Sequence, residues 1–249
     1  MTVDLLTVHI APDTHSMGSL AAKAIAADIK AIAEKKPYVR IMFAAAPSQD
    51  STLEALQVIE GVPWSQIIAF HMDEYVGIES SQPQSFRNYL TKRLFDNKPF
   101  KNVHLIAGDA QDPQAEADHY ESLLREAPLD IVILGIGENG HIAFNDPPDA
   151  NFQDDRLVRI ITLSEESRVQ QVHDGCFKQL GNVPKTAITV TIPAFLNASI
   201  LHCVVPNQRK AEAVKQTLYG PINSTCPASV LRMHPHANLY LDSMSASLL

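Results

Sequence analysis

The chain has 249 residues, of which 45% are hydrophobic, and a formal net charge of −8 at pH 7. This length and hydrophobic fraction suffice for a full core and fit one large α/β domain, and they argue against disordered, collagen-like and coiled-coil chains. The negative charge argues against a general nucleic-acid-binding protein, because binding to a phosphate backbone requires clustered lysine and arginine. It does not exclude a small anionic ligand, which needs only a few local donors.

Apolar runs and amphipathic segments alternate along the chain. Helical spacing of apolar residues predicts helices at residues 14–36, 48–61, 84–96, 112–127, 164–177 and 207–220, and a short helix at 227–234. Apolar runs predict strands at residues 5–11, 38–46, 65–75, 102–108, 129–137, 157–163, 185–193, 199–206 and 237–242. Strands of continuous Val, Ile and Leu that alternate with helices indicate a mostly parallel sheet with helices on both faces. We therefore expect a single Rossmann-like α/β domain over residues 1–249.

The cysteines and the first residues of the chain indicate its cellular compartment. The three cysteines are Cys176, Cys203 and Cys226, an odd number without CxxC spacing. This pattern favours reduced thiols in the cytoplasm over a disulfide framework or a zinc site. The chain also begins without a basic segment followed by a long apolar run, so we expect no signal peptide and no membrane span.

Ligands of such sheets bind at the carboxyl ends of strands, near a switch in strand order. Three turns that follow predicted strands hold most of the unusual polar residues: residues 44–50, 71–77 and 135–146. We expect the ligand site at these turns.

The third turn, within "LGIGENGHIAFNDPP", contains a histidine among glycines. Gly135, Gly137 and Gly140 match the GxGxxG pattern of dinucleotide-binding proteins, but the turn lies in mid-chain and its two prolines prevent the helix that this pattern requires. The sequence therefore predicts no nucleotide cofactor. His141 has two interpretations, a core histidine with satisfied ring nitrogens or a functional residue. Its place in a glycine-rich turn after a strand favours a functional residue.

The second turn, "FHMDEYVGI", places Asp73 and Glu74 side by side after a strand. Adjacent residues on an extended backbone face opposite sides, so we expect one carboxylate to face the ligand and the other to bond the protein itself. Two acids alone do not exclude a solvated acidic turn.

These two turns together resemble the glucosamine-6-phosphate deaminase family, a sister of the 6-phosphogluconolactonases, whose members read FNMDEYxGL and GxGxDGHIAFNEP. Three later segments, "VPKTAITVTIPAFLNA", "NQRKAEAV" and "PASVLRMHPHANLYLD", resemble family segments in the same order. The resemblance covers nearly the whole chain. It implies the conversion of glucosamine 6-phosphate and water into fructose 6-phosphate and ammonia.

The resemblance also assigns catalytic residues. It implies that Asp73 moves a proton between C2 and C1 and that His141 is the acid/base of ring opening, tasks suited to a carboxylate and an imidazole. Asn139 and Asp146 stand where the family has an aspartate and a glutamate that hold and charge-balance the histidine. An asparagine keeps the hydrogen bond but not the charge, whereas Asp146 keeps the charge with a shorter reach. Glu138 is an alternative source of the missing charge.

The substrate contacts that the resemblance implies are spread over several segments: Ala46, Ser48, Glu74, Gly135, Gly137, Ala143, Arg168, His173 and Lys210. The phosphate loop departs most from the family, which reads TGGTP where this chain reads "AAAPSQD". Pro47 removes a backbone amide, and Asp50 adds a negative charge near the helix start. The family's phosphate-binding arginine is replaced by His173 or Asp174, whereas Lys210 matches its second phosphate cation. We therefore expect weak phosphate binding.

Three interpretations remain open. The preferred one is a deaminase/isomerase for an amino-sugar 6-phosphate of either the glucosamine or the galactosamine type. The second is a lactonase or isomerase for a related or less-charged sugar, and the third is a non-catalytic sugar-binding or regulatory protein. The expected partner is a small-molecule sugar phosphate, with no metal or other cofactor, nucleic acid or membrane. Whether the chain forms a homo-oligomer is left open.

Overall fold

The computed structural model describes residues 1–249 and contains two β-sheets. The larger sheet holds, in spatial order, β1 (Thr2–Val3), β2 (Leu6–Ala11), β11 (Ala237–Asp242), β10 (Ile200–Val205), β7 (Ile131–Leu134), β3 (Val39–Phe43), β4 (Ile67–His71) and β6 (Asn102–His104). Only β1 is antiparallel to its neighbour; all other pairs are parallel. The prediction of a mostly parallel sheet is confirmed.

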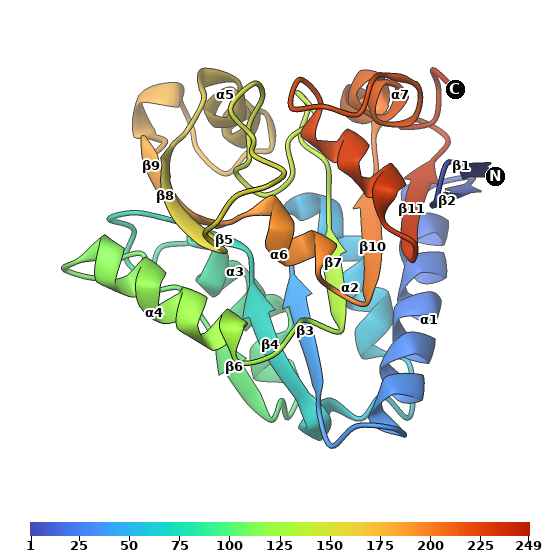
Figure 1. Ribbon diagram of the computed structural model, residues 1–249, viewed down its shortest axis with the longest axis horizontal. Helices are drawn as coiled ribbons and strands as arrows, with labels where there is room; N and C mark the ends of the chain where they lie inside the picture. The colour runs from blue at the N-terminus through green and yellow to red at the C-terminus, as the bar shows by residue number, and fades with distance from the viewer.

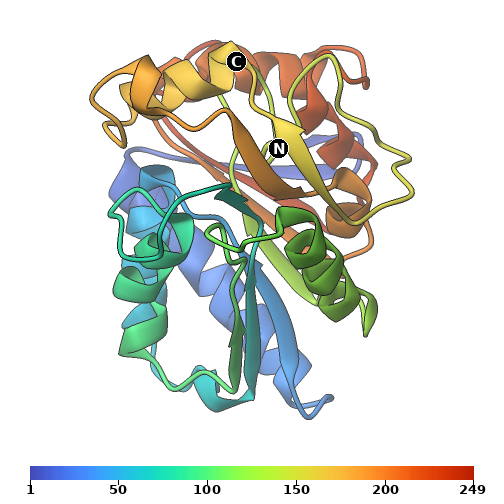
Figure 2. The ribbon, with the colours of Figure 1, turned by 90° about the vertical axis from the view of Figure 1, so that its left-hand side faces the viewer.

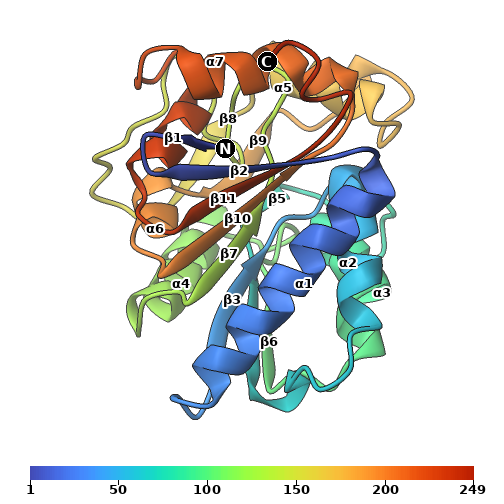
Figure 3. The same ribbon diagram turned by 90° about the vertical axis from the view of Figure 1, so that its right-hand side faces the viewer.

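Helices cover both faces of this sheet (Figures 1 and 3). On one face they are α1 (Thr14–Ala33), α2 (Asp50–Gln57) and α3 (Phe86–Arg93), and on the other α4 (Pro113–Arg125), α6 (Ile192–Leu196) and α7 (Ala211–Tyr219). Helix α5 (Glu165–His173) lies above the carboxyl ends of the strands (Figure 1). Successive residues of the central strand β7 point to opposite faces of the sheet. Ile131 and Ile133 belong to the core beneath α1, α2 and α3. Val132 and Leu134 belong to the core beneath α4, α6 and α7. Burial on both faces explains why the central strands are continuously apolar.

The smaller sheet differs from the prediction. It consists of β5 (Asp73–Tyr75), β9 (Thr186–Val190) and β8 (Val158–Thr162), all antiparallel, and it lies next to α4 (Figure 2). The predicted strand 65–75 is therefore two strands, because the chain leaves the large sheet after His71 and pairs with β9. Strand β8 lies at the edge of this sheet, and of its five residues only Val158 is buried.

Local signals set several helix starts. The side chain of Asp112 caps α4, with Pro113 as the first helical residue, and the side chain of Ser164 caps α5. The helix predicted from residue 48 begins instead with a 3₁₀ turn at Pro47–Gln49, and the short helix near the end of the chain is also 3₁₀, at Pro227–Met233. None of the helices combines the length and the apolar character needed to cross a membrane.

The fold brings the three predicted turns together. From β3 the chain proceeds outward to β4 and β6, and from β7 it proceeds in the other direction to β10 and β11. The order therefore switches between β3 and β7, which is where ligands bind in open α/β sheets. The turns after β3, β4 and β7 emerge at this edge, beneath α5 and α7 (Figure 1).

Candidate active site

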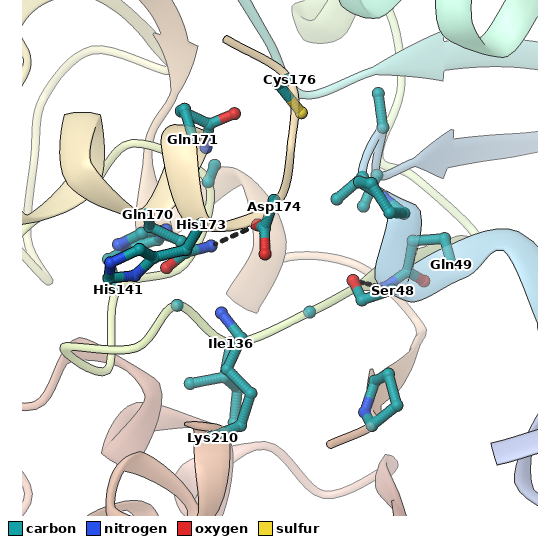
Figure 4. A pocket seen from close by; sticks show the side chains of 18 of the residues that line it. Ser48, Gln49, Ile136, His141, Gln170, Gln171, His173, Asp174, Cys176 and Lys210 are labelled. Carbon is teal, nitrogen blue, oxygen red and sulfur yellow. Dashed lines mark hydrogen bonds between the residues drawn. The ribbon is translucent and has the colours of Figure 1, made fainter. Parts of the chain in front are cut away.

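A cavity of about 330 Å³ lies at the carboxyl ends of β3, β4 and β7 (Figure 4). Its volume is within the usual range for small-molecule sites. Most of the residues expected from the sequence to form the site line it: Ala46, Ser48, Asp73, Gly135, Gly137, His141, Ala143, His173 and Lys210. Ala143 has a backbone φ of 51°, a conformation that non-glycine residues seldom adopt outside constrained sites.

His141 is held through the Nδ1 atom of its imidazole. Three oxygen atoms surround this nitrogen: Asn139 Oδ1 at 2.8 Å, Ser167 Oγ at 2.9 Å and Asp146 Oδ1 at 3.2 Å. Asn139 Oδ1 also accepts a hydrogen bond from the backbone N–H of His141 at 3.1 Å, and Asn139 Nδ2 donates one to Asp146 Oδ1 at 3.1 Å. The other ring nitrogen, Nε2, has no hydrogen-bond partner in the protein, so it is the atom left for a ligand.

Asp146 supplies the negative charge beside this imidazole. Burial raises the pKa of the Asp146 carboxyl, but its neighbours outweigh this effect. The hydrogen bond and charge of His141, and the hydrogen bonds from Ser167 and Asn139, hold that pKa well below its ordinary value. The carboxylate therefore balances an imidazolium directly. Glu138 does not substitute for it, because its carboxylate contacts His173 instead, with Nδ1 at 3.1 Å.

The glycines of the turn make room for the histidine. A Cβ atom on Gly137 would lie 2.2–2.4 Å from three ring atoms of His141, closer than any real contact. Gly140 has a φ of +86°, in the left-handed region that favours glycine. The GxGxxG match therefore reflects packing around an imidazole rather than a dinucleotide site.

Asp73 and Glu74 face opposite sides, as predicted for adjacent residues on a strand. Glu74 departs from the expected substrate contact: its carboxylate accepts hydrogen bonds from Ser85 Oγ at 2.7 Å and from three backbone N–H groups at 3.0–3.1 Å, two of them at the start of α3. It anchors α3 and does not line the cavity. The Asp73 carboxylate faces the cavity without a hydrogen bond in the protein. Burial, and secondarily the charge of Glu74, raises the pKa of Asp73 well above its ordinary value.

The other end of the cavity carries mixed charges. Lys210 is 4% exposed and forms no ion pair; burial lowers its pKa to about 8, although Asp174 and Glu138 counteract this shift. Arg209 lies between the same two carboxylates, with Nε 3.3 Å from Glu138 and Nη2 3.4 Å from Asp174. His173 completes the group through its contact with Glu138. The basic side chains therefore already face two carboxylates.

Similarity to known proteins extends over this whole arrangement. Residues 12–240 match the family described as glucosamine-6-phosphate isomerases/6-phosphogluconolactonase. The chain belongs to this family. A glucosamine-6-phosphate deaminase of Exiguobacterium sp. is 40% identical over 183 residues, which cover 74% of this chain and 70% of that protein. A glucosamine-6-phosphate deaminase of Listeria welshimeri is 38% identical over 202 residues, covering 81% and 84%.

Solved structures agree with this assignment. A monomeric glucosamine-6-phosphate deaminase superimposes with a TM-score of 0.90 at 30% identity, over 98% of this chain and 100% of that chain. A 6-phosphogluconolactonase from Thermotoga maritima superimposes with a TM-score of 0.79 at 18% identity, over 95% and 99%, and shares the fold. The expected family and fold class are confirmed.

Two residues expected near the phosphate lie elsewhere within this family fold. Arg168 Nη2 donates to the carbonyl oxygens of Leu180 and Val183 at 2.9 and 3.1 Å, outside the cavity lining. The reason is helical geometry: Arg168 follows Ser167, which faces His141, and consecutive helical residues point about 100° apart. Asp50 also differs from expectation. Its carboxylate accepts from Arg93 Nε at 2.6 Å, so its charge is paired rather than directed at the cavity.

Sequence reasoning missed several residues that line this cavity or contact His141. The unassigned residues are Ser167, Gln170 and Gln171 on α5, Arg209 beside Lys210, and Gln49, which donates to Val204 O at 3.3 Å. A signal was present for the residues of α5. Ser167, Gln170, Gln171 and Asp174 have i, i+3, i+4, i+7 spacing, so they share one helix face, and the first three are buried. A buried polar stripe indicates a site rather than a core face.

Proposed function

We propose that this protein converts an amino-sugar 6-phosphate and water into a ketose 6-phosphate and ammonia. One observation carries the proposal: an unpartnered, buried carboxylate, Asp73, and an imidazole with a free Nε2, His141, line the same cavity. The relatives at 38–40% identity are named glucosamine-6-phosphate deaminases, which supports this reaction over lactone hydrolysis.

The two residues divide the proton transfers. His141 Nε2 takes the proton of the anomeric hydroxyl and returns a proton to the ring oxygen, which opens the sugar. Asp73 then removes the C2 proton and delivers it to C1. The oxygen on C1 gains the proton that the C2 nitrogen loses, which leaves an imine at C2 that water hydrolyses to a ketone and ammonia. A base that takes a proton from carbon works best when its pKa is near the working pH, so the raised pKa of Asp73 suits this role.

The 6-phosphate would lie against Lys210, Arg209 and His173. Glu138 and Asp174 already contact Arg209, and Glu138 also contacts His173, so the basic groups are partly neutralised before any ligand arrives. This observation favours a second candidate, the same reaction on an amino sugar that carries less negative charge. Unpaired thiols at all three cysteines support the proposed cytoplasmic location.

The test compares substrates on the purified protein. Glucosamine 6-phosphate, galactosamine 6-phosphate, the two unphosphorylated sugars and 6-phosphogluconolactone are each supplied, and ammonia, ketose and acid release are measured. We expect ammonia and ketose in equal amounts from an amino sugar, and a comparison of kcat/KM with and without phosphate decides between the two candidates. Acid release from the lactone without ammonia from any amino sugar, or binding without turnover, would overturn the proposal.

A further inference from the structure

Ser167 lies at the contact between His141 and Asp146. Its side chain comes from the first turn of α5 and is 1% exposed. The hydroxyl oxygen is 2.9 Å from His141 Nδ1 and 2.5 Å from Asp146 Oδ1. The Ser167 backbone N–H donates to the Ser164 hydroxyl at 3.0 Å, as part of the N-cap of α5.

The proton positions in this cluster follow from the chemistry of the groups. Ionised Asp146 only accepts, so the single Ser167 proton points at Asp146 and the Ser167 oxygen accepts from His141. The Asn139 amide donates to Asp146 through Nδ2, so its oxygen faces the imidazole. Every oxygen around Nδ1 is therefore an acceptor. The neutral ring must carry its proton on Nδ1, which leaves Nε2 unprotonated.

We propose that Ser167 is a positioning residue that fixes this tautomer of His141 and couples the ring to the Asp146 charge. The inference rests on the proposed function, in which Nε2 accepts a sugar proton. When it does so, the ring becomes an imidazolium whose Nδ1–H is already directed at Ser167, Asn139 and Asp146. Because Asn139 is neutral, Asp146 is the only anion against the ring, and the Ser167 hydroxyl holds that carboxylate in place.

Loss of the Ser167 hydroxyl should slow the proton transfer rather than weaken substrate binding. In Ser167→Ala the Asp146 carboxylate loses a buried donor and the ring loses an acceptor, so the ring gains freedom to adopt the other tautomer. A buried hydrogen-bond group left without its partner corresponds to about a ten- to hundredfold effect. We expect kcat to fall by this factor with KM nearly unchanged.

The chain offers a matched control on the same helix. Ser164→Ala removes the N-cap of α5, so it should lower the melting temperature, but Ser164 does not contact His141 or Asp146. Ser167→Thr keeps the hydroxyl and should retain most of kcat. Ser167→Cys keeps the volume with a weak donor and should behave as Ser167→Ala does; it replaces that variant if the alanine protein does not fold.

Nitrogen-15 NMR of histidine-labelled protein provides a readout that does not need turnover. The His141 signals are assigned by their loss in His141→Gln. In the wild type we expect a protonated Nδ1 and an unprotonated Nε2, and in Ser167→Ala a shift of both signals toward the other tautomer. The inference is overturned if the wild-type ring carries its proton on Nε2, if Ser167→Ala and Ser167→Cys leave both signals and kcat unchanged, or if Ser164→Ala lowers kcat as much as Ser167→Ala. A wild type without ammonia release would instead count against the proposed function, and the NMR result would still stand.

Discussion

The two ends of the cavity are built in different ways. At the proton-transfer end, His141 lies among partners at 2.8–3.2 Å, and its three nearest side chains are at most half-exposed. At the basic end, Arg209 is 50% exposed and lies 3.3–3.4 Å from its two carboxylates. At the proton-transfer end, the hydrogen bonds that hold His141 are already formed before a ligand binds. At the basic end, a bound anion must replace the carboxylate contacts of Arg209, so binding there is more sensitive to pH and salt.

The largest expected effect is at the proton-transfer end. Asp73→Asn keeps the shape of the side chain but removes the base, so kcat should fall by about 10²–10⁴. The variant should not be less stable. Burial raises the pKa of Asp73, so the ionised carboxylate is disfavoured in the folded state, and this penalty grows as pH rises above the ordinary carboxyl range.

Stability and activity are measured on the same Asp73→Asn protein. Its melting temperature at pH 7 should equal or exceed that of the wild type, and the difference should shrink toward pH 4. Turnover within a factor of three of the wild type would show that another group is the base.

Gly137→Ala should have the next largest effect. The new Cβ would lie 2.2–2.4 Å from the His141 ring, so the imidazole must move, and a displacement of about 1 Å in a catalytic group reduces rates by about 10². The measurement is kcat together with the NMR signals of His141. Gly181→Ala is the control, because no atom lies within 4 Å of a Cβ built there. Equal activity of the two alanine variants would contradict the packing role of Gly137.

How far the sequence predicts each end depends on how far apart its residues are in the chain. Asn139, His141 and Asp146 lie within eight residues, so one motif predicted their cluster. The basic end combines α5 with the 3₁₀ helix Gln208–Lys210, and no local pattern showed that Arg209 would contact Glu138.

The misplaced residues have a related cause. The resemblance implied a substrate contact at Arg168, and the place of Asp50 near a helix start predicted a charge that repels phosphate. The orientation of both side chains depends instead on contacts with residues far along the chain, Arg93 for Asp50 and Leu180 for Arg168. The sheet was more predictable, because continuous apolar strands require burial on both faces. The short strand β5 was not, because its pairing with β9 depends on where the chain turns at Met72.

A charge-removal variant tests whether the basic end binds a phosphate at all. Arg209→Gln should raise KM for the phosphorylated amino sugar about tenfold with little change in kcat. Hydrogen bonds to charged groups contribute about 1.5–3 kcal/mol, and we take the lower part of this range because Arg209 is half-exposed and screened by solvent.

Salt and a matched variant serve as controls for Arg209→Gln. Lys215→Gln removes one positive charge from the exposed side of α7, outside the cavity, and should leave KM unchanged. The effect of Arg209→Gln should diminish as ionic strength rises. A KM that is the same for Arg209→Gln and the wild type, with phosphorylated and unphosphorylated sugars used equally well, would favour the less-charged substrate.

The smallest expected effect is the pH dependence of anion binding at Lys210. Burial lowers the pKa of this lysine to about 8, and a bound phosphate would favour its protonated form. The lysine is charged below this pH and neutral above it, so affinity should be full near pH 7 and fall as pH rises through 8. For a pKa of about 8, the protonated fraction falls roughly fourfold between pH 7 and 8.5. Calorimetric titration with the phosphorylated product should show this decrease, and His173→Gln, which removes the neighbouring imidazole, should show it as well. Affinity that stays constant over this interval would mean that Lys210 does not contact the bound anion.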